Sequence, residues 1–292
     1  MHKILFIFID GLGLGDNDPR TNPLVRFDPP FFRRLFGAPL TRELGPIARD
    51  DVCLVPTDAA LGVEGLPQSA TGQTAILTGV NAPLRMGRHI LGFPGPALAE
   101  IIAGHGIMRE LAAAGFAVTS ANMHTPDYLD LVARRQRRHS ATTLAILGAG
   151  AGLRSLAEMA AGEAIYQDIT NELLLQRKID GVAPVLPAEA GRRLVALARR
   201  HRFTMFEYFQ TDRLGHKADW QAAAEIVATL NGFLTAVSEK AGDMLVIITS
   251  DHGNFEDLSA KTHTRNPVPT ILFGPGCRAV AARIRDLTDL KP

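Results

Sequence analysis

The sequence has little cysteine and almost no excess of charge. Two of its 292 residues are cysteines, Cys53 and Cys277. Two thiols are too few for a disulfide framework, so we expect a reducing, cytoplasmic setting. Lysine and arginine number 31 against 30 aspartate and glutamate, which gives a formal net charge of +1. Because no basic stripe follows the chain, we do not expect nucleic-acid binding.

Long hydrophobic runs are also missing. The N-terminal apolar run covers residues 4–9 and ends at Asp10. It is too short for a membrane-spanning helix or for the core of a signal peptide, so we expect no membrane association. Hydrophobic residues make up 46% of the chain and charged residues 21%, proportions typical of a globular protein.

Apolar segments that resemble strands alternate with segments that resemble helices. The apolar run over residues 4–9 predicts a central strand of a parallel sheet, buried on both faces. Residues 116–120 follow a helix over 107–114 that ends at Gly115. Further strands are expected over 203–209 and 244–249, with a helix between them over 218–240. This order predicts an α/β fold with a doubly wound, mostly parallel sheet flanked by helices.

Polar residues follow the predicted strands where each strand ends. Asp10, Asp212 and the pair Asp251 and His252 each come at or just after an apolar run. The carboxyl ends of parallel strands meet at one edge of a sheet, and ligands bind outside that edge. We therefore expect these side chains to form one site.

The residue types at that edge are metal ligands. Asp212 and His216 are four residues apart, which on a helical turn brings both within reach of one ion. Asp251 and His252 before a glycine also fit an ordinary polar turn, and a lone His263 in a loop is more often structural. Taken together, the acids and imidazoles are enough for two divalent cations.

Residues 65–79 combine small residues with hydroxyls ahead of an apolar helix. Ser69 fits the N-cap of that helix. It also fits a nucleophile, since the N-terminus of a helix favours an anion and a metal there would lower the pKa of the hydroxyl. Thr71 is a competing nucleophile that the spacing does not exclude.

As a set, these motifs resemble the metal core of the alkaline phosphatase superfamily, in particular its cofactor-independent phosphoglycerate mutases and phosphopentomutases. The resemblance covers roughly residues 1–80 and 203–275, with the motifs in the family's order. It rests on Asp10-Gly11, Gly65-Leu66-Pro67 followed by Ser69 and Gly72, Asp212 to Gly215-His216, Asp251-His252-Gly253-Asn254, and His263-Thr264 followed by Asn266-Pro267-Val268-Pro269.

The resemblance implies a role for each motif. It implies Ser69, three residues before Gly72, as the nucleophile. Gln73 departs from the pattern, because the mutase branch usually has His there. The resemblance implies that one metal is held by Asp212, His216 and His263, and the second by Asp10, Asp251, His252 and the Ser69 oxygen. Ligands of these types suit Mn²⁺ and Zn²⁺ alike.

The implied function is two-metal phosphoryl transfer on a small phosphorylated metabolite through a phosphoserine. Attack of water on that intermediate would make a phosphatase, which we favour slightly, and attack of a retained product would make a phosphomutase. Sulfatases require Pro and Arg after the nucleophile, which are missing here, and phosphodiesterases that use Thr rank third. A non-catalytic metal-binding or ligand-binding protein is the alternative from another class. The oligomeric state is not predicted.

The middle of the chain lies outside the resemblance. We expect a single domain over 1–292, in which residues about 122–187 form a small cap, much shorter than the insertion of the mutases. Basic residues cluster at 134–138 and again at Arg85, Arg88 and His89. Charge clusters are mostly solvated, but either could bind a second phosphate or a carboxylate. The second cluster follows the Ser69 helix and is the candidate substrate contact.

Overall fold

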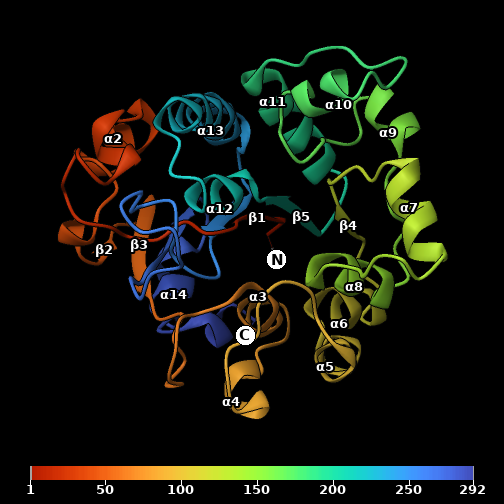
Figure 1. Ribbon diagram of the computed structural model, residues 1–292, viewed down its shortest axis with the longest axis horizontal. Helices are drawn as coiled ribbons and strands as arrows, with labels where there is room; N and C mark the ends of the chain where they lie inside the picture. The colour runs from red at the N-terminus through yellow and green to blue at the C-terminus, as the bar shows by residue number, and fades with distance from the viewer. Residues whose placement is uncertain (1, 292) are drawn as a thin grey trace.

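A central sheet organises the molecule. The computed structural model describes residues 2–291, and within them seven strands form one sheet in the order β2-β3-β7-β6-β1-β5-β4. Helices lie on both sides of this sheet (Figure 1). The strands are β1 (Ile4–Ile9), β2 (Ile47–Ala48), β3 (Val52–Thr57), β4 (Val118–Ser120), β5 (Phe203–Tyr208), β6 (Leu245–Thr249) and β7 (Val268–Phe273).

Two helical layers cover the sheet. On one side of the sheet lie α1 (Pro23–Arg26), α2 (Pro30–Phe36), α11 (Pro187–Ala198), α12 (Gln210–Gly215) and α13 (Trp220–Lys240). The opposite side holds α3 (Ser69–Thr78), α4 (Ala82–Met86), α5 (Pro96–His105), α6 (Ile107–Ala113), α8 (Ala141–Gly148) and α14 (Cys277–Ala281). Short 3₁₀ turns cover Arg42–Leu44 and Leu287–Leu290.

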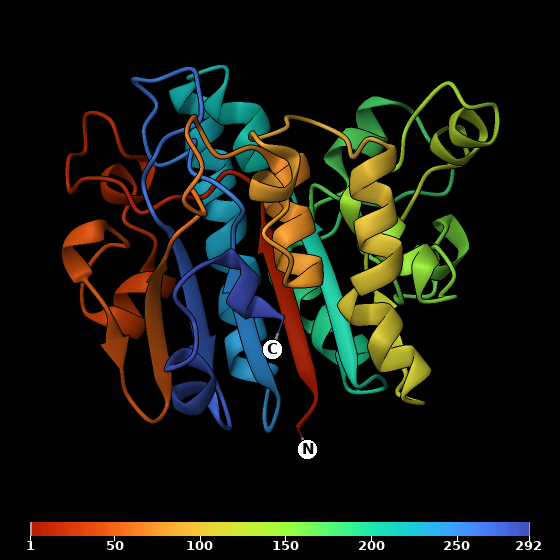
Figure 2. The same cartoon turned by 90° about the horizontal axis from the view of Figure 1, so that it is seen from below.

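Strand β1 is buried on both faces, as its continuous apolar run predicts. Leu5, Ile7 and Ile9 point into the core on the α13 side, and Phe6 and Phe8 point into the core on the α3 side. Side chains alternate along a strand, so a strand covered by helices on both faces needs apolar residues at every position. β1 pairs in parallel with β5 and β6, and Figure 2 shows it in red between them.

The sheet is mixed, because half of it is antiparallel. β4 continues the parallel part beside β5, whereas β7 runs antiparallel to both β6 and β3. The chain leaves β6, forms a loop over 250–267 and returns directly as β7, and such a neighbour needs no crossover helix. The α/β class and the flanking helices are confirmed.

The sequence analysis missed β2, β3 and β7. Pro56 of β3 pairs with Pro269 of β7. Proline has no N–H for the ladder, so a proline inside a short apolar run argues against a strand. The expected strands and helices around 4–9, 107–120, 203–209, 218–240 and 244–249 are all present.

Residues 122–187 divide between two environments. Helix α8 packs with α3, α5 and α6 on the main core. Helices α7 (Pro126–Ala133), α9 (Leu156–Ala160) and α10 (Glu172–Gln176) lie beyond the β4 edge of the sheet (Figure 1). A small apolar cluster of Met123, Met159, Ala164, Tyr166 and Leu174 is separate from the main cores. None of the helices within residues 2–291 combines the length and apolar character that a membrane crossing requires.

The two-sided burial of β1 predicts a large cost for truncating its side chains. Ile7→Ala should lower the free energy of unfolding by about 2–5 kcal/mol, because it leaves a cavity in the core. Leu147→Ala, at a side chain that is 42% exposed on α8, should change it by less than about 0.5 kcal/mol. Urea denaturation of both variants measures the difference, and equal effects would contradict this assignment of the core.

Candidate metal centre

The carboxyl ends of the neighbouring strands β5, β1 and β6 bring the predicted ligands together. Asp10 follows β1, Asp212 lies in α12 directly after β5, and Asp251 comes two residues after β6. The segments that carry these residues approach one another closely. A Cβ atom on Gly11, whose φ is +72°, would lie 2.8 Å from the Cβ of Asp212, and one on Gly72 would lie 3.0 Å from the Cβ of Asp251. Glycine at these two positions lets the segments meet.

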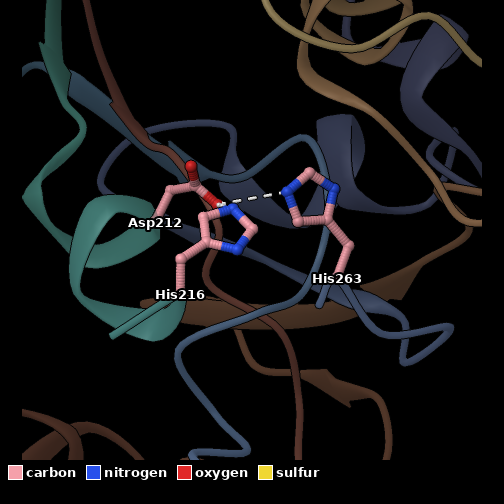
Figure 3. A group of neighbouring side chains, drawn as sticks. All are labelled: Asp212, His216 and His263. Atoms are coloured by element: carbon pink, nitrogen blue, oxygen red, sulfur yellow. Dashed lines mark ion pairs between the residues drawn. The ribbon is translucent and has the colours of Figure 1, made fainter. Parts of the chain in front are cut away.

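The first group of ligands is Asp212, His216 and His263. Asp212 Oδ1 lies 3.3 Å from His263 Nε2 and 3.4 Å from His216 Nε2. In Figure 3 both imidazoles face the Asp212 carboxylate, one from α12 and the other from the 250–267 loop. Burial opposes ionisation of both Asp212 and His263. Their mutual hydrogen bond, together with the other hydrogen bonds and charges around them, outweighs burial, lowering the pKa of Asp212 to about 2 and raising that of His263.

The second group shares Asp212 and adds Asp10 and His252. In each of the two groups, one ligand atom from every residue lies within 4.8 Å of the others. His252 Nε2 is 3.3 Å from Asp10 Oδ1 and 3.5 Å from Asp251 Oδ2. It also lies 2.9 Å from Ser69 Oγ. The structure thus brings together all the ligands that the sequence predicted for both ions.

The hydrogen bonds of the three imidazoles fit metal ligation. The Nδ1 atoms of His216 and His263 lie 3.0 and 2.8 Å from the carbonyl oxygens of Lys261 and Pro67, and His252 Nδ1 lies 3.4 Å from that of Gly253. A ring nitrogen that faces a carbonyl carries the proton and donates it. The three Nε2 atoms face the carboxylates and would offer their lone pairs to an ion that takes the place of a proton there.

The buried carboxylates fit the same interpretation. Asp10 is 7% exposed and Asp251 is fully buried. The pKa of Asp10 lies well above its usual value. Burial is the largest cause, and the nearby carboxylates of Asp251 and then Asp212 add to it. Asp10 Oδ1 is buried and has no hydrogen-bond partner. A lone pair held in this way suits a divalent cation, which would offset the repulsion between the acids.

Glu256 connects the loops that carry the ligands, and the sequence analysis missed it. Its carboxylate accepts hydrogen bonds from the backbone N–H groups of Gly13 and Asn254, and from the side chains of Thr264 and Asn266. It is 1% exposed. A buried acid with this many donors joins the two ends of the 250–267 loop to each other and to the segment after β1. Its only signal in the sequence is an acid two residues after Asn254.

Glu207 is a second missed residue. It lies on β5, lines the same cavity as Asp10 and accepts a hydrogen bond from Thr142 Oγ1. Burial, with a smaller contribution from Asp251, raises the pKa of Glu207 to about 7. The signal was an acid interrupting the apolar run 203–209. An acid so placed adds to the negative charge around Asp10.

Ser69 and Thr71 have different surroundings. Ser69 is the first residue of α3 and Gln68 is its N-cap, so the expectation that Ser69 itself caps the helix was wrong. The Ser69 hydroxyl instead faces His252. Thr71 is fully buried, where it donates to the Gln68 carbonyl and accepts from the backbone N–H of Ile90.

A cavity of about 770 Å³ extends from Ser69, Asp10 and Asp212 toward residues 122–177. Arg85, Arg88 and His89 do not line it, so the structure does not support them as substrate contacts. Arg85 lies in α4, beyond the far end of α3 from Ser69, and ten helical residues span about 15 Å. The cavity-lining arginines are Arg137, Arg177 and Arg213.

Comparisons with known proteins find similarity in part of the sequence and in the fold. Residues 188–290 match a family model described as the metalloenzyme superfamily. The structure of the PH0037 protein from Pyrococcus horikoshii aligns over 99% of this chain and 90% of its own, with a TM-score of 0.57 and 13% identity. A TAB5 alkaline phosphatase variant with Mg bound in its M3 site aligns with a TM-score of 0.52 and 12% identity, over 99% and 96% of the two chains. Part of this chain is therefore similar in sequence to the metalloenzyme superfamily, and its fold is similar to that of an alkaline phosphatase.

Proteins similar to it in sequence include 2,3-bisphosphoglycerate-independent phosphoglycerate mutases. The one from Pyrobaculum islandicum is 28% identical over 121 residues, or 41% of this chain and 29% of the mutase. The one from Agrobacterium fabrum is 38% identical over 77 residues, or 23% of this chain and 15% of the mutase. The chain therefore matches less than a third of the length of these curated relatives. These matches show that segments of the chain are similar in sequence to segments of the mutases.

Removing Asp212 should abolish most of the stabilisation that metal ions give, because this residue belongs to both ligand groups. Mn²⁺ or Zn²⁺ at a hundredfold excess over its dissociation constant should raise the free energy of unfolding by about 2.7 kcal/mol per site. Asp212→Asn should lose most of this gain, whereas Asp243→Asn, at an exposed turn before β6, should keep it. Denaturation with and without each metal measures the gain, and an unchanged gain in Asp212→Asn would contradict the assignment.

Proposed function

We propose that this metalloenzyme transfers phosphoryl groups of small phosphate monoesters through a phosphoserine at Ser69, with two divalent cations bound. The observation that carries the proposal is the place of the Ser69 hydroxyl. It lies 2.9 Å from His252 Nε2 and lines the same cavity as Asp10 and Asp212. A nucleophile, two ligand groups and space for a substrate therefore meet at one point.

The N-terminus of α3 supports a phosphate at the same point. Its N-cap residue, Gln68, makes no side-chain capping hydrogen bond. The N–H groups of a first helical turn have no partner within the helix and favour an anion, as does the helix dipole. Ser69 begins this helix, so its oxygen and these donors would contact the same bound phosphate.

The chemistry needs few groups. Two cations, held by the ligand groups around Asp212 and Asp10, would supply charge that offsets the phosphate and favours the serine alkoxide. The Ser69 oxygen then forms a bond to phosphorus as the bond to the leaving oxygen breaks, and the leaving group takes a proton and departs as an alcohol. Attack of water on the phosphoserine releases inorganic phosphate and restores Ser69.

We favour hydrolysis over mutase action. A mutase must keep water away from the phosphoserine while its product turns round. The cavity is lined by the exposed side chains of Phe93, Arg137 and Arg177. Water has access along these residues, and the small apolar cluster around Tyr166 is the core of a cap too small to seal it. Mutase action remains the second candidate because of the relatives in sequence.

The far end of the cavity supports an anionic metabolite as the substrate. Its acids, Asp10, Glu207 and Asp212, lie at the sheet end. Arg137, at the opposite end, lies with its guanidinium 5.6 Å from the centre of the Tyr128 ring. An arginine facing a cavity suits a carboxylate or a second phosphate. Buried free thiols at Cys53 and Cys277 support the reducing cytoplasm as the setting.

Ser69→Ala should lower phosphate release from p-nitrophenyl phosphate by at least about a thousandfold, because the nucleophile is lost. Acid quenching followed by mass spectrometry should find phosphoserine at residue 69 in the wild type alone. Thr71→Val, at the other hydroxyl of α3, should keep most of the activity.

Release that survives in Ser69→Ala would contradict the phosphoserine route. Product isomerisation with little phosphate release would show a mutase instead. A wild type that binds both ions but transforms no monoester in a panel of sugar, glycerate and aryl phosphates would favour the non-catalytic alternative.

Arg137→Ala should raise KM about tenfold for monoesters that carry a second anionic group, since a hydrogen bond to a charged group contributes about 1.5–3 kcal/mol. The KM for p-nitrophenyl phosphate, which has no second anion, should stay the same. The matched control is Arg138→Ala, since the neighbouring Arg138 does not line the cavity. Equal KM values in the two variants for the dianionic substrates would contradict a role for Arg137.

A further inference from the structure

Gln73 makes contacts that the proposed reaction does not use. Its side-chain nitrogen Nε2 lies 3.2 Å from Asp10 Oδ2 and 3.3 Å from Asp251 Oδ2. Gln73 is 6% exposed, and both of its partners are buried. One neutral amide therefore joins the two acids predicted to hold the second ion.

The chemistry of the amide fixes its direction. A carboxylate only accepts hydrogen bonds, so the amide must turn its NH₂ group toward both acids, with one hydrogen for each. The amide occupies Asp10 Oδ2 and leaves Asp10 Oδ1 without a partner, 3.3 Å from His252 Nε2. The oxygen left free is the one that faces the other predicted ligands.

The spacing in α3 explains why position 73 has this role. Gln73 follows Ser69 by four residues, so one helix face presents the hydroxyl and, one turn later, the amide. Between them in the sequence, Gly72 lets α3 approach the backbone of Asp251, where a Cβ atom would lie 3.0 Å from its carbonyl oxygen. The same close approach brings the amide within reach of both carboxylates.

We propose that Gln73 is a positioning residue, which holds Asp10 and Asp251 in the orientation that binds the second ion. This inference rests on the proposed two-metal function. The choice of a neutral donor has a physical reason. A lysine or arginine would also hydrogen-bond both acids, but its charge would take the place of the cation. An amide orients the acids and leaves their negative charge available to the ion.

The experiment compares Gln73→Met with the wild type. Methionine keeps the length and volume of the side chain and removes its donors. Calorimetric titration of the metal-free proteins with Mn²⁺ alone, and separately with Zn²⁺ alone, measures the affinity of each site. We expect Gln73→Met to bind the second ion about 10–100-fold more weakly, because outer hydrogen bonds contribute about that much to metal affinity. The first ion should bind as in the wild type.

Asn254→Ala is the reciprocal control. Asn254 Nδ2 donates to Asp212 Oδ1 over 2.8 Å, so it supports the shared ligand of both groups. We expect Asn254→Ala to weaken the first ion as well as the second, a pattern that Gln73→Met should not show. Urea denaturation without metal establishes that each variant folds.

The possible results separate this inference from the proposed function. A Gln73→Met protein that folds and binds both ions as tightly as the wild type would show that Gln73 only fills space, and would overturn the inference. Equal weakening of both ions in Gln73→Met would overturn it too, because the effect would then be general. A wild type that binds a single ion would overturn the two-metal function itself.

Discussion

Repulsion between buried carboxylates is the constraint on which the site depends. Asp10, Asp212 and Asp251 lie at the carboxyl ends of adjacent strands, with Glu207 on the strand beside them. The effect is visible in Asp10, whose pKa rises through burial and through its acidic neighbours. Folding brings these charges together, so the arrangement is favourable only when donors and cations offset them. The imidazoles and the hydrogen bonds to the carboxylates offset part of this repulsion.

Neutral side-chain amides donate hydrogen bonds to the acids in the structure without ions. Asp212 accepts from Asn254, and Asp10 and Asp251 accept from Gln73. Glu256 has a different role, because its carboxylate belongs to neither ligand group and accepts hydrogen bonds from four donors in three segments. It fixes the loops so that the ligands above them need little rearrangement when an ion binds.

Much of the fold and of the candidate site could be predicted from the sequence, because the features concerned depend on residues close together in the chain. The apolar run before Asp10 and the four-residue spacing of Asp212 and His216 are determined by strand burial and helix geometry, which depend on nearby residues. The antiparallel strands β3 and β7 could not be found in this way, since Pro56 and Pro269 are tolerated only because of their pairing. Arg85 illustrates the converse error. Proximity to Ser69 in sequence was taken as proximity in space, although α3 lies between them.

The distribution of charge along the cavity bears on the substrate that we propose. Acids gather at the sheet end, where divalent cations would reverse the local charge, and Arg137 and Arg177 line the end formed by residues 122–177. A phosphate monoester meets positive charge at both ends only once the ions are bound. Without them, Asp10 and Asp212 would repel it, so substrate binding should follow metal binding. Under the proposed function, the metal would therefore be the group that attracts the phosphate. The arginine end, which the resemblance to the superfamily does not cover, would be the part of the chain that distinguishes one monoester from another.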